Sequence, residues 1–293
     1  MKLILGKIFQ SPLSRHLQSI YALEKKGAFL VADRWKIVLL HANGDVEPVW
    51  QTSDEDIAYK WRGIFDDRLS DELYIDISET RKSGFRLLGK EACQRIESGT
   101  AYYGHDEKVI AFQGKRIVLL GLEKDGLVEC AKTKTKGKDP VAWALHPHQN
   151  TIIYGTNYGE LYAQPFEDNL FEKPVKIDVL PNTCYQIEFS TDGKKMFVAG
   201  LGYVKVFDCN EKIFSPNVSL TTAVKSFELV DKYLFLNKGM HGIDVLKMGE
   251  NPERIESLDL PFSIDKMYYL ASQKTFLLIS GSTDEWALFT WVD

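Results

Sequence analysis

The 293-residue sequence has only four cysteines, and no two of them form a CxxC pair. Cys93, Cys130, Cys184 and Cys209 are separated by long and irregular intervals, which excludes a zinc ribbon and a thioredoxin-like motif. Four cysteines in a chain of this length do not suggest a disulfide scaffold. We therefore expect reduced thiols and a cytoplasmic protein.

Long apolar runs and a basic charge balance are also missing. No stretch approaches the roughly 18 apolar residues of a membrane helix, and the apolar run at the N-terminus is too short for a signal peptide. The net charge is -5, whereas nucleic-acid binders usually carry a basic stripe. We therefore expect neither a membrane nor a nucleic-acid partner. The mild acidity would suit a basic protein partner, although it is also ordinary for a soluble protein.

Motifs of catalysis and cofactor binding are absent as well. The sequence contains no GxSxG elbow, no glycine-rich phosphate loop and no HExxH motif. His146-Pro147-His148 has no third ligand at a definite spacing, so we interpret it as a turn and expect neither a metal site nor a cofactor. Catalytic residues scattered over loops would leave no such motif. A small-molecule hydrolase or lyase therefore stays open as an alternative.

Aromatic residues are plentiful, with 16 Phe, 13 Tyr and 6 Trp, and this composition favours strands. Short β-rich runs recur at intervals of 36 to 44 residues, and each is followed by a turn and a second alternating run. This interval matches the roughly 40–45 residues of one four-stranded propeller blade. The first runs are Ala28–Val31, Leu73–Ile77, Val109–Phe112, Thr151–Tyr154, Met196–Ala199, Tyr233–Leu236 and Thr275–Ile279.

The repeat predicts an all-β fold, a seven-bladed β-propeller of four-stranded antiparallel blades that forms one domain over residues 1–293. The run Glu285–Val292 leaves the last blade one strand short, so we expect Lys2–Phe9 to pair with it and close the ring. Local alternatives stay open. Lys36–Leu40 and Arg116–Leu120 fit second as well as third strands, and Leu13–Lys26 fits a short amphipathic helix.

Two segments resemble repeats of the WD-repeat family. Tyr185–Gly200 looks like the first hairpin of such a repeat, and Phe207-Asp208 stands where the family has its Trp-Asp pair. Ala142–Asn150 resembles the same hairpin in the preceding repeat. The Trp-Asp pair itself never appears, and Gly104-His105 is the only copy of the family's Gly-His dipeptide. The resemblance implies a propeller that serves as an interaction platform.

In a WD-type propeller, one face collects the loops between the second and third strands of every blade. Aromatic residues, Arg and Met are enriched at protein interfaces, so we predict that the partner binds these loops. The alternative is that several of these rings pack between blades. The candidate residues are Arg34, Trp35, Arg81, Asn157, Tyr158, Tyr203, Met240, His241, Asp284 and Trp286.

These observations together predict a protein that binds another protein and does not catalyse a reaction. One concrete version is an immunity-type protein that neutralises a cognate toxin, for which a basic toxin would suit the acidic chain. Two alternatives remain. One is the hydrolase or lyase that uses the central channel of the propeller, and the other is a structural subunit of a larger assembly.

Overall fold

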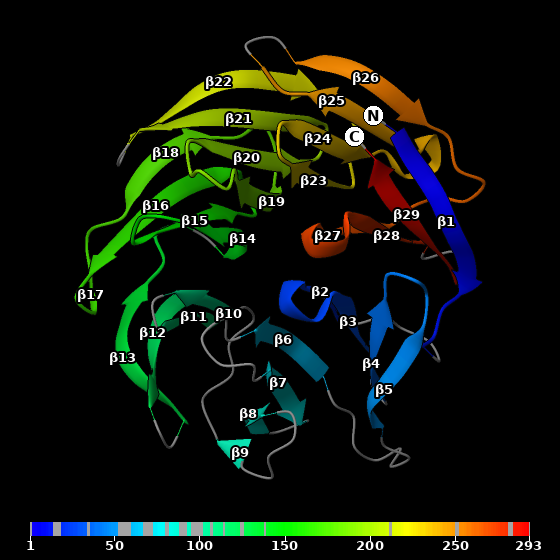
Figure 1. Ribbon diagram of the computed structural model, residues 1–293. Coiled ribbons are helices and arrows are strands. Elements are labelled where there is room, and N and C mark those ends of the chain that lie inside the picture. Colours follow the sequence, from blue (N-terminus) through cyan, green and yellow to red (C-terminus); the bar gives the residue numbers. More distant parts are fainter. Residues whose placement is uncertain are drawn as a thin grey trace. The chain divides into compact units, whose positions relative to one another are not determined.

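Figure 1 shows the computed structural model of the chain. The structure describes residues 2–13, 19–33, 36–51, 60–66, 73–79, 82–87, 93–94, 102–105, 108–113, 115–123, 126–137, 139–210, 213–249, 252–280 and 284–292. The chain forms two compact units. Unit 1 comprises Met1–Gln10 and Thr135–Asp293, and unit 2 comprises Ser11–Lys134.

Unit 2 contains three antiparallel sheets among its described residues, each with four strands in chain order. The first sheet consists of β2 (Ser19–Leu23), β3 (Ala28–Ala32), β4 (Lys36–His41) and β5 (Val46–Gln51). The second consists of β6 (Lys60–Asp66), β7 (Leu73–Glu79), β8 (Lys82–Leu87) and β9 (Cys93–Gln94). The third consists of β10 (Tyr102–His105), β11 (Lys108–Gln113), β12 (Arg116–Glu123) and β13 (Gly126–Lys134).

Unit 1 contains four further antiparallel sheets among its described residues. The first consists of β14 (Pro140–Leu145), β15 (Thr151–Thr156), β16 (Glu160–Glu167), β17 (Leu170–Phe171) and β18 (Val175–Val179). The second consists of β19 (Cys184–Phe189), β20 (Lys195–Gly200), β21 (Tyr203–Asn210) and β22 (Ile213–Thr221). The third consists of β23 (Ser226–Val230), β24 (Tyr233–Asn237), β25 (Ile243–Lys247) and β26 (Glu253–Leu258). The fourth consists of β27 (Lys266–Leu270), β28 (Thr275–Ile279), β29 (Glu285–Val292) and β1 (Lys2–Gln10).

The strand assignments made from the repeat are confirmed. β4 and β12 are third strands of their sheets, which excludes the alternative that they are second strands. The helix considered for Leu13–Lys26 is wrong where the structure describes this segment. Ser19–Leu23 is a strand that pairs with β3, and a 3₁₀ turn follows at Glu24–Lys26. Pairing with β3 buries Ile20 and Leu23, and this tertiary gain outweighs the local helical periodicity.

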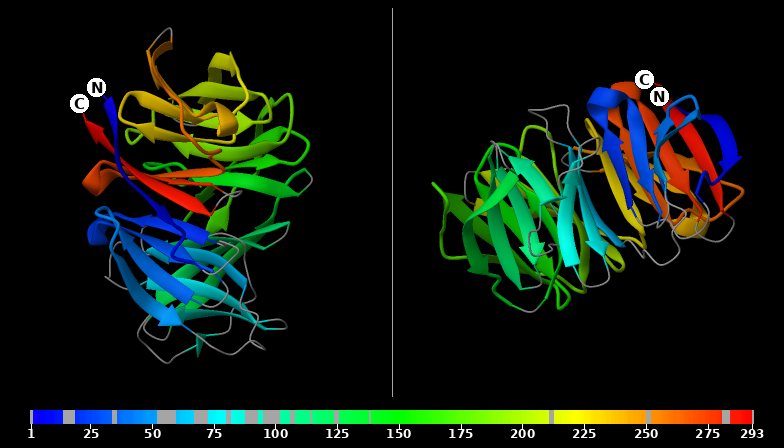
Figure 2. Two further views of the ribbon diagram at one scale, coloured as in Figure 1. Left: turned by 90° about the vertical axis from the view of Figure 1, so that its right-hand side faces the viewer. Right: turned by 90° about the horizontal axis from the view of Figure 1, so that it is seen from below.

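The predicted pairing of the two ends of the chain is also confirmed. β1 runs antiparallel to β29, with Leu3 opposite Trp291 and Phe9 opposite Trp286. The views in Figures 1 and 2 both show the N- and C-terminal strands side by side. β1 thus covers the free edge of β29 and supplies the fourth strand of the last sheet of unit 1. The closed ring, the count of seven blades and the single domain stay predictions.

The core of unit 1 lies between successive sheets. Phe235 of β24 packs against Phe276 of β28, with ring centroids 4.5 Å apart, and against Trp291 of β29 at 4.9 Å. Phe197 of β20 similarly contacts Phe227 of β23, at 6.3 Å between centroids. Aromatic pairs at these separations add to the free energy gained by burying apolar surface. The large side chains of each sheet therefore anchor it to the next one.

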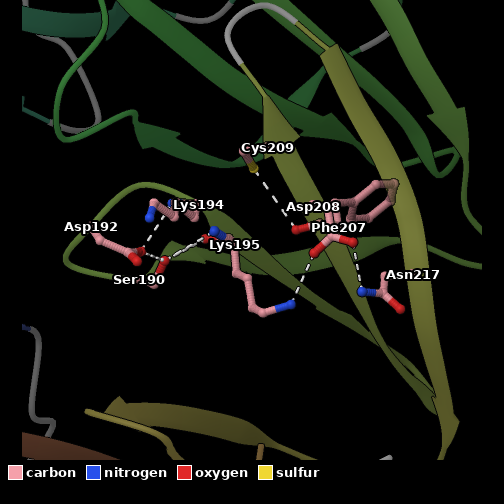
Figure 3. A network of polar contacts seen from close by, with 8 residues as sticks. All are labelled: Ser190, Asp192, Lys194, Lys195, Phe207, Asp208, Cys209 and Asn217. Carbon is pink, nitrogen blue, oxygen red and sulfur yellow. Dashed lines mark hydrogen bonds and ion pairs between the residues drawn. The ribbon is translucent and has the colours of Figure 1, made fainter. Parts of the chain in front are cut away.

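The hairpin that resembles a WD repeat has its own polar network, shown in Figure 3. Phe207 is fully buried in place of the family's tryptophan. The carboxylate of Asp208 forms an ion pair with Lys195 Nζ at 2.9 Å and accepts a hydrogen bond from Asn217 Nδ2 at 2.6 Å. The turn itself is closed by Ser190 Oγ, which donates to Asp192 Oδ1 at 2.6 Å. Local polar contacts thus close the turn between β19 and β20 and join β20 to β21 in the absence of a Trp-Asp pair.

The turn predicted at His146-Pro147-His148 is confirmed. The imidazole of His146 is buried; its Nδ1 accepts the His148 backbone N–H at 3.1 Å, and its Nε2 lies 3.0 Å from Gly193 O. Burial lowers the pKa of His146, the bond to Gly193 opposes this effect, and His148 adds to it. Both ring nitrogens are therefore engaged, and the neutral ring ties this turn to the next hairpin.

Two findings apply to the part of the chain that the structure describes. No group of three or more His, Cys, Asp or Glu side chains is placed so that it could hold a metal ion. No helix in these ranges is long and apolar enough to cross a membrane. Cys130, Cys184 and Cys209 are free thiols, as expected. Burial raises the pKa of Cys184 and of Cys209 to about 12, so neither is an activated nucleophile.

Candidate functional site

Three turns of unit 1 each expose one large apolar side chain. Each turn joins the second and third strands of its sheet, where the sequence places the binding face. Tyr158 is 59% exposed, Leu201 is 71% exposed and Met240 is 77% exposed. We call these three residues the apolar triad. Large apolar side chains exposed on successive loops are typical of surfaces that bind other proteins.

The turn that carries Tyr158 is tight and depends on glycine. Gly159 has a φ of +77°, in the left-handed region that glycine adopts freely. A Cβ at this position would lie 2.6 Å from Leu180 O, so glycine is also required for the close approach of the loop between β18 and β19. The Gly159 N–H donates to Thr156 O at 3.0 Å. This geometry turns Tyr158 outward.

The loop between β18 and β19 connects two of these turns. Thr183 Oγ1 donates to Asn157 O at 2.8 Å, and Asn182 Nδ2 donates to Leu201 O at 3.2 Å. Tyr203 OH donates to Asn182 O at 3.1 Å from the next sheet. The backbones beneath Tyr158 and Leu201 are therefore fixed before any partner arrives, which lowers the entropic cost of binding.

The turn that carries Met240 is held in a similar way. Gly239 O accepts the Ile264 N–H at 3.3 Å, from the loop that precedes β27. On the other side, Lys238 Nζ pairs with Asp244 Oδ2 at 2.9 Å. Burial raises the pKa of Asp244, but the hydrogen bonds from Ser257 and Lys238 and the nearby positive charges outweigh it, so this pKa lies below its usual value. The carboxylate thus stays ionised and keeps its ion pair with Lys238, which precedes the turn.

The predicted site residues divide into three groups. Those that the structure places at the surface are Asn157, Tyr158, Met240, His241 and Asp284. Two predicted residues, Tyr203 and Trp286, are 3% and 2% exposed, which corrects our expectation that they project from the loops. Arg34, Trp35 and Arg81 lie outside the described residues. The apolar triad thus comes from three successive sheets of unit 1, and Asp284 belongs to the fourth.

The burial of the two rings has a clear local cause. Tyr203 opens β21 and stands opposite Gly200, where a Cβ would lie 2.3 Å from the tyrosine ring. The ring therefore folds back over the glycine. Trp286 stands opposite Phe9 of β1, and the two ring centroids are 6.2 Å apart. Strand β1 thus covers Trp286, and neither ring is available to a partner.

Leu201 is the exposed residue of the Leu201–Tyr203 segment that the sequence analysis placed on the binding face without choosing it as an anchor. It lies in a loop that we predicted to bind, but we singled out Tyr203 two positions later. The signal was present in Gly200-Leu201-Gly202-Tyr203. Gly202 adopts a φ of +82°, and this two-residue turn leaves Leu201 at its tip.

Comparisons with known proteins bear on the fold. No protein-family model and no curated protein matches the sequence. The β-propeller domain of Myceliophteria thermophila Cps50 (Swd1) matches with a TM-score of 0.74 and 9% identity, over 99% of this chain and 100% of that chain. A chain of the mitotic checkpoint complex matches with a TM-score of 0.77 and 7% identity, over 99% and 96% of the two chains. The WD40 β-propeller domain of Doa1 matches with a TM-score of 0.70 and 11% identity, over 99% and 98%. The chain therefore has the fold of a WD-repeat β-propeller.

Proposed function

We propose that the protein binds another protein through the apolar triad and does so without catalysis. The observation that carries this proposal is the exposure of Tyr158, Leu201 and Met240 on equivalent turns of three successive sheets. Hydrogen bonds between neighbouring loops hold the first two turns rigidly. Rigid aromatic and aliphatic anchors with a polar surround are the arrangement found at protein interfaces.

The solved structures with a similar fold support the same proposal. One of them is a chain of a multiprotein assembly, the mitotic checkpoint complex, and propellers of this kind commonly serve as interaction platforms. The more specific hypotheses, a toxin-neutralising immunity protein and a basic partner, stay predictions. The cytoplasmic location and the structural-subunit alternative also stay predictions. A one-to-one complex in solution would exclude the structural-subunit alternative.

The test is loss of the partner on truncation of the triad. The full-length protein is used to capture its partner from the native cell, and the captured partner is then purified. We expect Tyr158→Ala, Leu201→Ala and Met240→Ala each to weaken binding, with the strongest anchor losing about 30-fold in affinity, or about 2 kcal/mol. Affinity is measured by calorimetry beside the melting temperature of each variant.

The matched control is Val175→Ala, a truncation of an exposed apolar residue at the far end of the outer strand β18. This variant is expected to bind like the wild type. If all three triad variants are folded and bind normally, the partner does not use this surface and the proposal is wrong.

A further inference from the structure

The first sheet of unit 1 carries a second feature at the end opposite Tyr158, a pocket of about 400 Å³. Its lining includes Gln149, Asn150, Pro165, Phe166 and Glu167. β15 runs from the pocket to the Tyr158 turn, and a strand rises about 3.3 Å per residue, so the two sites lie roughly 17 Å apart. The pocket is therefore separate from the apolar triad. Its volume lies in the range of small-ligand sites.

The pocket arises because β16 extends beyond its neighbour. β18 pairs with β16 only over Glu160–Ala163, and the chain beyond folds back as the short hairpin of β16 with β17. Asp168 and Asn169 form its turn with φ values of 44° and 68°, as in a two-residue hairpin loop. Figure 1 shows β17 at the tip of this sheet. The hairpin forms one wall, and the turn before β15 forms the other.

Three side-chain amide oxygens in this region are shielded from water and lack a hydrogen-bond partner among the described residues: Gln149 Oε1, Gln164 Oε1 and Asn169 Oδ1. Gln149 lines the pocket directly. Gln164 is fully buried, and its Nε2 group donates to Pro165 O at 3.2 Å and to Glu172 O at 2.5 Å. Buried polar atoms are nearly always satisfied in folded proteins, so the unsatisfied Gln149 oxygen indicates that a hydrogen-bond donor is missing at the pocket. Gln164 and Asn169 belong to the adjoining β16–β17 hairpin.

The charge of the lining points to the same kind of ligand. The lining contains two carboxylates, those of Glu167 and Glu172, and no Lys, Arg or His. A guanidinium group supplies one positive charge and five N–H donors in a plane, and it can bind a carboxylate through two hydrogen bonds. The methylene stem of an arginine would pack on the apolar surface of Pro165 and Phe166. An ammonium group has only three donors on a single atom and would reach fewer of the acceptors.

We propose that this pocket binds a guanidinium group of the kind that arginine carries. The proposal is independent of the function assigned to the apolar triad, because the two sites share no residue. Two sources of the group fit the chemistry: an arginine side chain in another polypeptide, and a free guanidine such as L-arginine.

The test is a titration of the full-length protein by calorimetry and NMR. The probes are L-arginine and the capped tripeptide Gly-Arg-Gly, with the matched tripeptides that carry lysine or citrulline in place of arginine. We expect saturable one-site binding of at least one arginine probe. The citrulline tripeptide has nearly the same shape without the charge, so it should bind at least about tenfold more weakly. Binding of the tripeptide assigns the source to a polypeptide, whereas binding of L-arginine alone assigns it to a free guanidine.

The site is then tested with two variants. Glu167→Gln removes a charge from an exposed side chain and should not affect folding, and Gln149→Leu removes an acceptor; each is expected to weaken binding at least about tenfold. Glu253→Gln, which changes an exposed carboxylate on β26, is the matched control and should bind like the wild type. Absence of saturable binding at millimolar concentrations, or unchanged binding in Glu167→Gln, would overturn the proposal.

Discussion

Gln186 shows how a single side chain joins two sheets of unit 1. Its Oε1 accepts the Phe227 N–H at 3.0 Å, and its Nε2 donates to Phe227 O at 2.6 Å. Gln186 belongs to β19 and Phe227 to β23, the first strands of neighbouring sheets. The amide therefore satisfies one backbone donor and one backbone acceptor on β23, an edge strand of its sheet.

We predict that Gln186→Leu lowers the free energy of unfolding by about 1–3 kcal/mol, because both backbone groups of Phe227 lose their partner. Urea denaturation measures this change. Gln273→Leu, at an exposed position in a 3₁₀ turn, is the matched control and should stay within about 0.5 kcal/mol of the wild type. Equal stability of the two variants would show that the bridge does not contribute.

Two carboxyl groups on the same pair of strands bind protons unusually tightly. Burial raises the pKa of Glu188 to about 7, against the opposing hydrogen bonds from Gln186 and from the Leu229 N–H. Burial, followed by the negative charge of Glu188, raises the pKa of Glu228 well above its ordinary value. The folded chain therefore holds more protons on these groups than the unfolded chain does above pH 4.5, the ordinary pKa of glutamate.

The free energy of unfolding should accordingly fall as the pH rises from about 4.5 through 7. We predict that Glu228→Gln, which cannot ionise, becomes progressively more stable relative to the wild type across this window. Urea denaturation at a series of pH values measures the difference between the two proteins. Glu253→Gln, at an exposed position of β26, is the matched control and should stay within about 0.5 kcal/mol of the wild type. A constant difference for Glu228→Gln would mean that its carboxyl is not perturbed.

At the scale of strands, the buried side chain of β1 is Leu3, near the start of the strand. Leu3 is 4% exposed and lies in the core with Phe289 and Trp291, whereas Leu5 on the same strand is 48% exposed. We predict that Leu3→Asp strongly reduces soluble protein, because it buries an unpaired charge, and that Leu5→Asp does not. Soluble yield and melting temperature measure both variants. Wild-type yield and melting temperature of Leu3→Asp would contradict this prediction.

Much of this strand arrangement could be predicted from the sequence. Alternating runs at a regular interval marked the second and third strands correctly, because a strand with two different faces must alternate. The short hairpin of β17 could not be foreseen, since Leu170 and Phe171 are too few to show a period. We predicted the pairing of β1 with β29, but the register that places Phe9 opposite Trp286 and buries this ring has no local pattern in the sequence. The burial of Tyr203 could have been predicted, because Gly200 stands three positions before it in the sequence and leaves room for its ring.

For the molecule as a whole, the repeat still predicts seven blades closed into one ring and one domain. We therefore expect residues 1–293 to unfold in a single cooperative transition, with equal calorimetric and van't Hoff enthalpies. Differential scanning calorimetry measures both. Two separate transitions, or an experimental structure with six or eight blades, would contradict this prediction.

The pairing of β1 with β29 also has a consequence for the synthesis of the protein on the ribosome. β1 is made first, but its partner strand ends only at Val292. At translation rates of about 5–20 residues per second, roughly 15–60 s pass between the synthesis of β1 and the synthesis of β29. Leu3, which β29 and its neighbours bury in the folded protein, stays accessible during that time. The nascent chain is therefore expected to be a client for chaperones that shield apolar segments until β29 has been made.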